Sequence, residues 1–356
     1  MQIKSIPEDF VVVEIAHHTV QETGEYALCE MTKRNLTTER ALSTVADTLK
    51  IPRRFLGYAG TKDARAITRQ YITIKTERPD ILNTSQRIQK DNLSLRFLGF
   101  VQEPLSLGNL EKNRFEIVVR KITDEKIHIL TAIPNYFDEQ RFSTANAQIG
   151  KLILQKMFLD AAHLVIQTDP DAAQRMKDHL AEKPNDAITA LRLIPKNILL
   201  LYVHAYQSLL FNEVLSEYIK QNDNEAIFAD GPVPLLIPTK EIKNVRIPIF
   251  GFGTEHDEIF GKLYEIILNR EGLTSRDFVV KSLPFLTVEG GFRDAFFIVE
   301  EITCDALDED DLFPNNKKQK LCFTLPKSCY ATMVVKCLYH VGRINGDGQQ
   351  IKTETI

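Results

Sequence analysis

One segment, residues 55–75, gathers the residue types that could do chemistry. It reads FLGYAGTKDARAITRQYITIK, and in it an apolar run ends in a glycine-flanked turn that carries Lys62 and Asp63. Glycine lets the backbone approach a large ligand closely. A carboxylate beside cations favours its ionised form, so Asp63 would serve as a nucleophile or an electrostatic base rather than as an acid. An Asp in this setting is also a common turn residue.

Basic residues surround this turn. Between residues 50 and 70 the only acid is Asp63. Such a cluster suits contacts with nucleic-acid phosphates, but it can equally be a solvated surface. The chain as a whole carries a net charge of -4, so overall charge gives no sign of a dedicated nucleic-acid binder. The cations of the cluster are Lys50, Arg53, Arg54, Lys62, Arg65 and Arg69.

Other catalytic and ligand-binding motifs are missing from the sequence. The run from Gly57 to Asp63 lacks the spacing of a phosphate-binding loop, and Gly251-Phe-Gly253 lacks the third glycine of a dinucleotide fingerprint. The chain has 5 cysteines and no C-x-x-C pair, which argues against a structural zinc site or a disulfide framework. The sequence therefore predicts no metal and no cofactor.

The elements that must position the turn follow from residue patterning. Runs rich in β-branched and aromatic residues predict strands, and stripes of apolar residues at helical spacing predict helices. Strands are expected at residues 10–15, 26–31, 55–59, 67–74, 93–101, 115–121, 295–299 and 320–325. Helices are expected at residues 39–50, 124–131, 145–166, 169–179, 185–192, 203–221 and 260–270.

The order of these elements is β-rich, then α-rich, then β-rich. The sequence therefore predicts an α+β fold with a mixed or antiparallel sheet domain built from residues 1–150 and 288–356. A mostly helical domain, residues 151–287, is expected to interrupt it. The acidic, polar run at residues 305–316 is expected on the surface.

No stretch of about 18 uncharged apolar residues suggests a membrane span. Pro7, Glu8 and Asp9 stand where a signal peptide would have its apolar region. We therefore expect a cytoplasmic protein with no membrane partner.

The segment around Asp63 resembles the signature of the TruD family of pseudouridine synthases, which runs approximately G-x-K-D-x-x-A-x-T-x-Q. A match of this length is very unlikely by chance. The matching residues are Gly60, Lys62, Asp63, Ala66, Thr68 and Gln70.

Four more segments resemble elements of that family in the same chain order. Residues 7–14 resemble P-E-D-F-x-V-x-E, with Lys4 three residues before the proline. Residues 135–143 resemble N-Y-F-G-x-Q-R-F-G, and residues 205–212 resemble a helix with A-x-Q-S-x-L-F-N. Residues 325–332 resemble L-P-x-G-S-Y-A-T. The resemblance covers most of the chain.

The resemblance implies a pseudouridine synthase sheet domain with a helical insertion domain. It implies tRNA as the partner and a uridine, commonly position 13 in the D-arm, as the target. It also implies that Asp63 is the catalytic carboxylate, either attacking C1′ of the ribose or promoting a glycal intermediate. Neither a metal nor an obligate protein partner is expected.

A uridine inside folded RNA must be flipped out to react, and the extruded base needs an aromatic face and polar partners. By the resemblance, Phe137 and Phe10 are expected to stack, and Asn135 to bond to the base or to Asp63. The same residues have ordinary interpretations, since Phe10 suits a core position and Asn135 a turn. Lys4 and Lys62 are expected to hold a carboxylate or a phosphate.

The sequence departs from the family pattern at three places. Asp138 stands where the family usually has glycine, and Ser143 replaces another glycine. Ser328 and Cys329 stand where Gly-Ser is usual. Asp138 would add a negative charge near the expected base pocket, which puts the pocket geometry in question.

Two other functions fit parts of the pattern. A non-catalytic RNA-binding or RNA-folding protein would keep the basic cluster and the aromatics but has little use for Asp63. A glycosidase-like hydrolase would need a second carboxylate as its acid, for which Glu14 is the only weak candidate.

Overall fold

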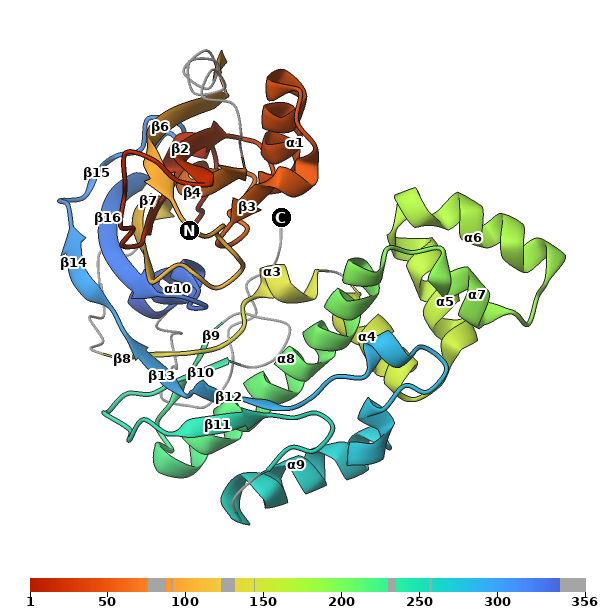
Figure 1. Ribbon diagram of the computed structural model, residues 1–356. Helices are drawn as coiled ribbons and strands as arrows, with labels where there is room; N and C mark the ends of the chain where they lie inside the picture. The colour runs from red at the N-terminus through yellow and green to blue at the C-terminus, as the bar shows by residue number, and fades with distance from the viewer. Residues whose placement is uncertain are drawn as a thin grey trace. The chain divides into compact units, whose positions relative to one another are not determined.

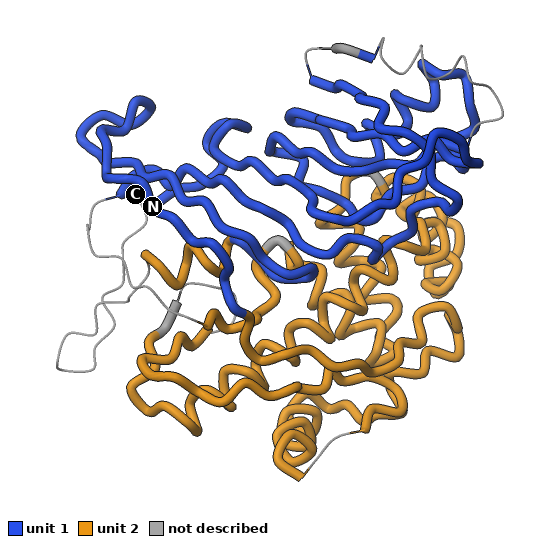
Figure 2. Tube along the Cα trace, turned by 60° about the vertical axis from the view of Figure 1, so that its left-hand side comes forward, with its two compact units in different colours: residues 1–127, 298–331 blue, residues 128–297, 332–356 orange. Residues whose placement is uncertain are grey.

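The computed structural model describes residues 1–75, 88–90, 92–122, 132–143, 145–229, 235–255 and 258–339. The chain divides into two compact units, shown in different colours in Figure 2. Unit 1 comprises Met1–Ile127 and Ile298–Ala331, and unit 2 comprises His128–Phe297 and Thr332–Ile356. These limits differ from the predicted boundaries at residues 150 and 288, because the stretch that follows residue 132 bonds to the long helix of unit 2. The catalytic and insertion domains remain predictions.

Unit 1 is built on one mixed sheet, in which β1 pairs with β4 in parallel and the other pairs are antiparallel. Its order is β14-β16-β7-β1-β4-β2-β6-β5, with β15 paired to β16 and β3 to β4. Figure 1 shows this sheet in the part of the molecule that carries the N-terminus. The strands are β1 (Phe10–Ile15), β2 (Tyr26–Arg34), β3 (Leu56–Tyr58), β4 (Ile67–Lys75), β5 (Gln89–Lys90), β6 (Leu93–Val101), β7 (Lys112–Ile122), β14 (Glu300–Cys304), β15 (Asp308–Glu309) and β16 (Lys317–Pro326).

Helix α1 (Thr38–Leu49) supplies the core on one face of this sheet. Its N-terminus is capped by Thr37, whose hydroxyl accepts a hydrogen bond from the Arg40 N–H. It ends where Lys50 adopts a left-handed conformation with φ of 55°. The apolar stripe of α1 packs in one cluster with the inward residues of β2, β3, β4 and β6. The spacing of that stripe is therefore what fixes this layer.

Unit 2 is mostly helical, as predicted for the middle of the chain. Three two-stranded sheets accompany its helices: β8 (Ala132–Pro134) with β13 (Phe296–Ile298), β9 (Ile227–Ala229) with β10 (Leu235–Ile237), and β11 (Arg246–Ile249) with β12 (Gly291–Asp294). The helices are α3 (Glu139–Phe142), α4 (Asn146–Leu154), α5 (Phe158–Thr168), α6 (Pro170–Glu182), α7 (Ala187–Arg192), α8 (Lys196–Asn222) and α9 (Glu258–Glu271), together with α10 (Ala331–Tyr339), which starts at the last residue of unit 1.

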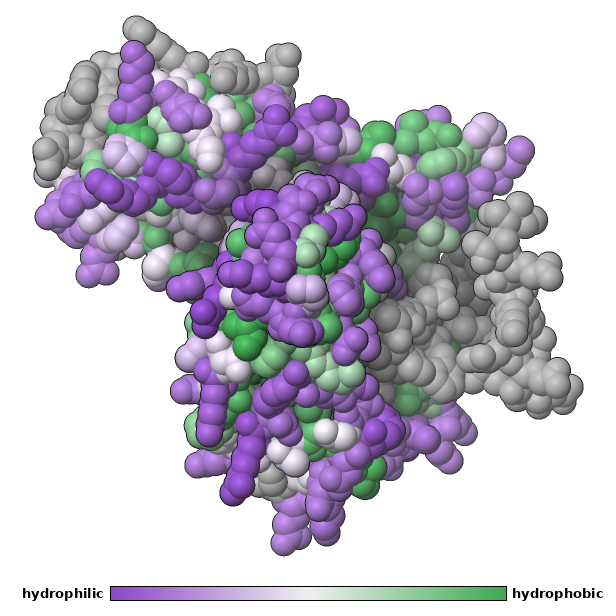
Figure 3. All heavy atoms as spheres, turned by 90° about the vertical axis from the view of Figure 1, so that its right-hand side faces the viewer, coloured by the Kyte–Doolittle hydropathy of each residue, from purple (hydrophilic) through white to green (hydrophobic). Residues whose placement is uncertain are grey.

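The 27-residue helix α8 is the core of unit 2. It buries side chains on all sides rather than on one stripe, as a central helix does. In length and hydropathy it could cross a membrane, but 67% of its most apolar window is buried inside the protein. The features of α8 are therefore those of a core helix. By contrast, the face around α6, turned to the viewer in Figure 3, is mainly hydrophilic.

Most predicted elements are present with shifted ends. Strands β1 and β6 have the predicted limits, while α10 was not predicted. The helix expected at residues 124–131 lies outside the described residues. The acidic run at residues 305–316 is not wholly on the surface, because Asp310 is only 7% exposed. Asp310 is buried because it forms an ion pair with Arg120 at 2.8 Å.

Candidate functional site

Asp63 lies in the irregular connection between the antiparallel strands β3 and β4 of unit 1. Glycine at position 57 lets β3 lie close to the main chain of Leu105 and to the Thr73 side chain. A Cβ atom there would lie 2.5 Å from the Leu105 carbonyl oxygen and 2.5 Å from the Thr73 hydroxyl. We name residues 60–63, which carry the carboxylate, the Asp63 loop. The sheet thus presents the predicted catalytic residue on a short, fixed turn.

Lys4 forms an ion pair with Asp63, with 2.7 Å between Nζ and Oδ1. Both side chains remain accessible, at 19% and 23% exposure. The Lys4 ammonium also lies 4.1 Å from the centre of the Phe10 ring, a cation–π contact. Phe10 itself is 1% exposed and packs edge-on against Phe115. The structure thus brings Lys4, Phe10 and Asp63 together, with Phe10 beneath the lysine as a core residue.

Lys62, the neighbour of Asp63, pairs with a different carboxylate. Its Nζ lies 2.8 Å from Oε2 of Glu14, and the side chains are 6% and 0% exposed. Neither carboxylate oxygen of Glu14 receives a geometrically good hydrogen bond within the described residues, so the contact is ionic. The two lysines expected to hold a carboxylate or a phosphate therefore both hold carboxylates. Glu14, the weak candidate for a second catalytic acid, is paired and buried.

The main chain of the Asp63 loop is held by buried polar side chains. The Lys62 N–H donates to the Thr38 hydroxyl at 3.0 Å, and the Gln70 amide donates to the Gly60 carbonyl at 3.2 Å. Thr38 and Gln70 also bond to each other at 3.3 Å. Gln70 belongs to the sequence signature, and this bond gives it a physical role.

The basic cluster around the loop has two kinds of members. Lys62 points inward, and Arg53 is paired with Glu39 at 2.9 Å. Four cations are exposed and available to a phosphate backbone. These are Lys50, Arg54, Arg65 and Arg69.

In unit 2, the segment after β8 carries the other predicted residues. Asn135 is 6% exposed, and its Nδ2 donates to the Asp294 carbonyl at 3.0 Å. Arg293 donates to the main-chain oxygen of Asn135 at 2.8 Å and also to its side-chain oxygen. The Asn135 amide is therefore fixed in orientation by a strand, β12, that is distant in sequence.

Phe137 follows on the same segment and is partly exposed. Asn212 of α8 accepts from the Phe137 N–H at 2.8 Å and donates to its carbonyl at 2.7 Å. The Phe137 ring meets Phe211 edge-on, and the Arg293 guanidinium lies 4.2 Å from its centre. Asn212 thus holds this segment against α8 within unit 2.

Asp138 is 4% exposed, and its charge is matched locally. Lys336 of α10 lies 2.8 Å from Asp138 and 2.8 Å from Glu139. Burial alone would lower the pKa of Lys336, but these two carboxylates raise it overall. The departure from glycine at position 138 therefore adds an ion pair rather than an unmatched charge.

Comparison with known protein families gives a match along most of the chain, in both units. The family model described as tRNA pseudouridine synthase D (TruD) matches residues 1–177, 170–231 and 236–338. This chain belongs to the TruD family. Members of this family isomerise uridine in tRNA to pseudouridine, so the chain is an isomerase of the tRNA pseudouridine synthase class.

Relatives of the chain carry the same name. It is 29% identical to "tRNA pseudouridine synthase D" of Aquifex aeolicus, over 95% of this chain and 98% of that protein. It is 26% identical to "Probable tRNA pseudouridine synthase D 1" of Methanococcus maripaludis, over 96% and 100%. A crystal structure from Methanosarcina mazei, assigned as tRNA pseudouridine synthase D (TruD), has the same fold with a TM-score of 0.69 at 24% identity. The structural match covers 95% of this chain and 93% of the Methanosarcina mazei chain.

Two polar residues of this TruD chain, Arg293 and Lys33, were not predicted from the sequence. Arg293 bonds to Asn135, and Lys33 bonds to Asp63, and in each case the two residues lie far apart in the chain. Nothing in the run GFRDAFF marks Arg293, although an arginine between aromatic residues is a weak sign of stacking.

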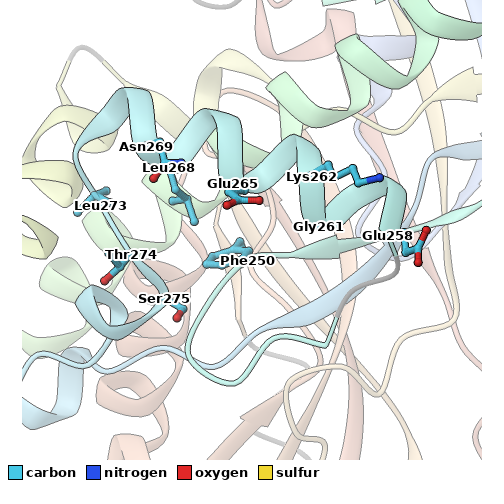
Figure 4. Close-up of a pocket in the computed structure, with 10 residues that line it drawn as sticks. All are labelled: Phe250, Glu258, Gly261, Lys262, Glu265, Leu268, Asn269, Leu273, Thr274 and Ser275. Atoms are coloured by element: carbon cyan, nitrogen blue, oxygen red, sulfur yellow. The ribbon is translucent and has the colours of Figure 1, made fainter.

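A cavity of about 580 Å³ opens beside α9 in unit 2 (Figure 4). It is lined by Phe250, by the α9 residues from Glu258 to Asn269 that face it, and by residues 273–275. None of the predicted site residues lines it. Among the described residues, no group of three or more His, Cys, Asp and Glu is arranged to hold a metal ion.

Proposed function

We propose that this chain isomerises uridine 13 in the D-arm of tRNA to pseudouridine with Asp63 as its catalytic carboxylate. The observation that carries the proposal is the Asp63 loop, a family signature in which the carboxylate is partly accessible and paired with Lys4 at 2.7 Å. The ion pair gives the carboxylate one orientation, as a group that must meet a single ribose requires.

The reaction breaks the N1–C1′ bond, turns the uracil and forms the C5–C1′ bond. C5 then loses its proton and N1 gains one, so the product is an isomer of the substrate. Asp63 acts at the ribose, either by attacking C1′ or by removing the C2′ proton to give a glycal. Both routes end with the carboxylate restored.

The remaining residues have supporting roles in this proposal. Phe10 carries Lys4, and Lys62 binds Glu14 and so holds the loop rather than the RNA. In unit 2, Phe137 offers a partly exposed ring on which the flipped uracil stacks. The Asn135 amide uses one hydrogen and one lone pair in its contacts with Asp294 and Arg293, and its other hydrogen and lone pair serve the base.

The exposed cations around the Asp63 loop bind the phosphates of the tRNA. We propose that the enzyme works in the cytoplasm, without a metal, a cofactor or an obligate protein partner.

The test is pseudouridine mapping on unmodified tRNA treated with the native chain or with Asp63→Asn. Pseudouridine at position 13 with the native chain and none with Asp63→Asn supports the proposal. Pseudouridine at another position rejects only the site of modification. Activity retained by Asp63→Asn rejects the role of Asp63.

The second candidate is a non-catalytic RNA-binding protein on the same scaffold. The exposed cations favour it as much as they favour the enzyme. If the native chain and Asp63→Asn both bind tRNA and neither forms pseudouridine on any tRNA, the binding function replaces the enzymatic one for these substrates.

A further inference from the structure

The Asp63 loop contains a third anchor besides Thr38 and Gln70. Lys33 lies near the end of β2, between Thr68 of β4 and Leu93 of β6. It is 0% exposed and continues the face of β2 on which Cys29 and Met31 pack against α1. A lysine in such an apolar setting is rare, because transfer of an ammonium out of water is costly unless its hydrogens are bonded.

The Lys33 ammonium is bonded to main-chain carbonyls. Its Nζ lies 2.6 Å from the Asp63 oxygen, 2.7 Å from the Leu36 oxygen and 3.4 Å from the Lys62 oxygen. The three hydrogens of an ammonium match three acceptors, which a neutral amine with two hydrogens cannot do. Two of the three acceptors are the main-chain oxygens of Lys62 and Asp63, and Asp63 carries the proposed catalytic carboxylate.

Buried side chains supply much of this anchoring. In the described part of the chain, the side chains of Lys33, Thr38 and Gln70 bond to the Lys62 N–H and to the carbonyls of Gly60, Lys62 and Asp63. The nearest main-chain bonds are at Ala59, whose carbonyl accepts from the Gly108 N–H, and at Ala64, whose carbonyl accepts from the Ala66 N–H. The direction in which Asp63 leaves the backbone is therefore set by buried side chains of β2, α1 and β4.

We propose that Lys33 is a positioning residue for pseudouridine formation, holding the Asp63 main chain so that its carboxylate meets the ribose. This inference rests on the proposed function of Asp63. Lys33 touches neither the RNA nor the carboxylate in this role and acts through the backbone alone.

Because only the charged form of Lys33 can donate three hydrogen bonds, its positioning role should depend on pH. Burial lowers the pKa of Lys33 to about 8, with Asp63 raising it and Lys62 lowering it further. The other residues beside it in the sheet, Thr68 and Leu93, do not ionise at these pH values. The anchor is therefore complete below about pH 8 and loses a hydrogen bond above it.

The test compares Lys33→Met, which keeps most of the length of the side chain and removes the ammonium, with Ile74→Val. Ile74 is a fully buried β4 residue in the same core, and this change removes one methyl group without touching the loop. Single-turnover rates are measured by release of tritium from C5 of labelled uridine in tRNA. Affinity for tRNA is measured by filter binding, and folding by circular dichroism.

We expect Lys33→Met to lower the rate at saturating tRNA by about 10- to 100-fold, because a small displacement of a catalytic group has that effect. Affinity should stay within about twofold, and Ile74→Val should match the native chain. A native rate for Lys33→Met, or a loss confined to tRNA affinity, overturns the proposal.

The native chain provides a second measurement that does not depend on the folding of a variant. Its single-turnover rate should fall as pH rises through about 8, and folded Lys33→Met should lack this step. A native rate that is level between about pH 7 and 9 overturns the proposal. If neither the native chain nor Ile74→Val forms pseudouridine, the proposed function has failed, whereas native activity with no effect of Lys33→Met rejects only the role of Lys33.

Discussion

Lys62 and Glu14 form an ion pair of 2.8 Å within unit 1, in which both side chains are almost completely buried. The pair joins the Asp63 loop to β1, the strand that also carries Phe10. Because two charges have been removed from water together, each depends on the other. The signature lysine beside Asp63 thus binds a carboxylate of the protein itself.

Glu14→Gln should therefore destabilise the protein, since it leaves the Lys62 ammonium buried without its partner. The expected loss in free energy of unfolding is about 3 kcal/mol. Urea unfolding of Glu14→Gln, Lys62→Met and the double variant measures it. The double variant should be more stable than the sum of the single losses predicts. Additive losses would mean that the pair contributes no coupling.

Lys4→Met should leave the fold intact and slow the chemistry. The change removes the ammonium that lies 2.7 Å from Asp63 Oδ1 and leaves Phe10 in the core. We expect the single-turnover rate to fall by about 30- to 100-fold, because the carboxylate loses its fixed orientation. Tritium release at saturating tRNA measures this rate.

Lys112→Met is the matched control for Lys4. Lys112 is also in unit 1 and also pairs with a carboxylate, Glu300, at 2.6 Å, but it belongs to no part of the Asp63 loop. The single-turnover rate of Lys112→Met should stay within about twofold of the native rate. If Lys4→Met and Lys112→Met lower the rate equally, Lys4 acts only through its positive charge.

The sequence predicted what depends on local pattern. Residues 10–15 alternate buried and partly buried side chains, and the apolar stripe of α1 repeats at helical spacing, so both elements were predictable. The turn at Asp63 was predictable because glycine, lysine and aspartate follow one another in the chain.

The contacts that hold the site were not predictable in the same way. Lys33 lies 30 residues before Asp63, and Arg293 lies 158 residues after Asn135. A lysine in a strand normally indicates a solvent-facing position, and only the fold shows that Lys33 faces inward. Asp310 was assigned to the surface for the same reason, since its partner Arg120 is 190 residues away.

Asp310 should make the stability of the protein depend on acid pH. Burial would raise the pKa of Asp310, but hydrogen bonds from the Lys121 N–H, other main-chain N–H groups and Arg120 lower it overall. A carboxylate with a lowered pKa in the folded state stabilises the protein above its unfolded value of about 3.9. This contribution is lost as pH falls through the folded value.

Asp310→Asn measures that contribution. At pH 7 we expect a loss of about 1–3 kcal/mol in the free energy of unfolding, the usual range for hydrogen bonds to a charged group. The difference between native and variant proteins should shrink as pH falls from about 5 towards 2.5. A difference that stays constant over this range would show that the carboxylate charge contributes nothing.

Arg293 should act on activity through Asn135 and Phe137. Its guanidinium bonds to both oxygens of Asn135 and lies 4.2 Å from the Phe137 ring centre, so one side chain fixes two residues proposed to bind the base. We expect Arg293→Met and Asn135→Ala each to lower the single-turnover rate by about 10-fold. Because the two changes disturb one arrangement, the double variant should fall well short of the product of the single losses.

Arg246→Met is the control that separates this arrangement from positive charge in general. Arg246 belongs to β11, the strand paired with β12, and its guanidinium lies 5.1 Å from the centre of the Phe292 ring. It is therefore a second arginine over an aromatic ring on the same two-stranded sheet, and no hydrogen bond to Asn135 is present among the described contacts. Its rate at saturating tRNA should stay within about twofold of the native rate. If Arg293→Met and Arg246→Met reduce the rate equally, or if the losses from Arg293→Met and Asn135→Ala multiply, the bonds to Asn135 are not what makes Arg293 matter.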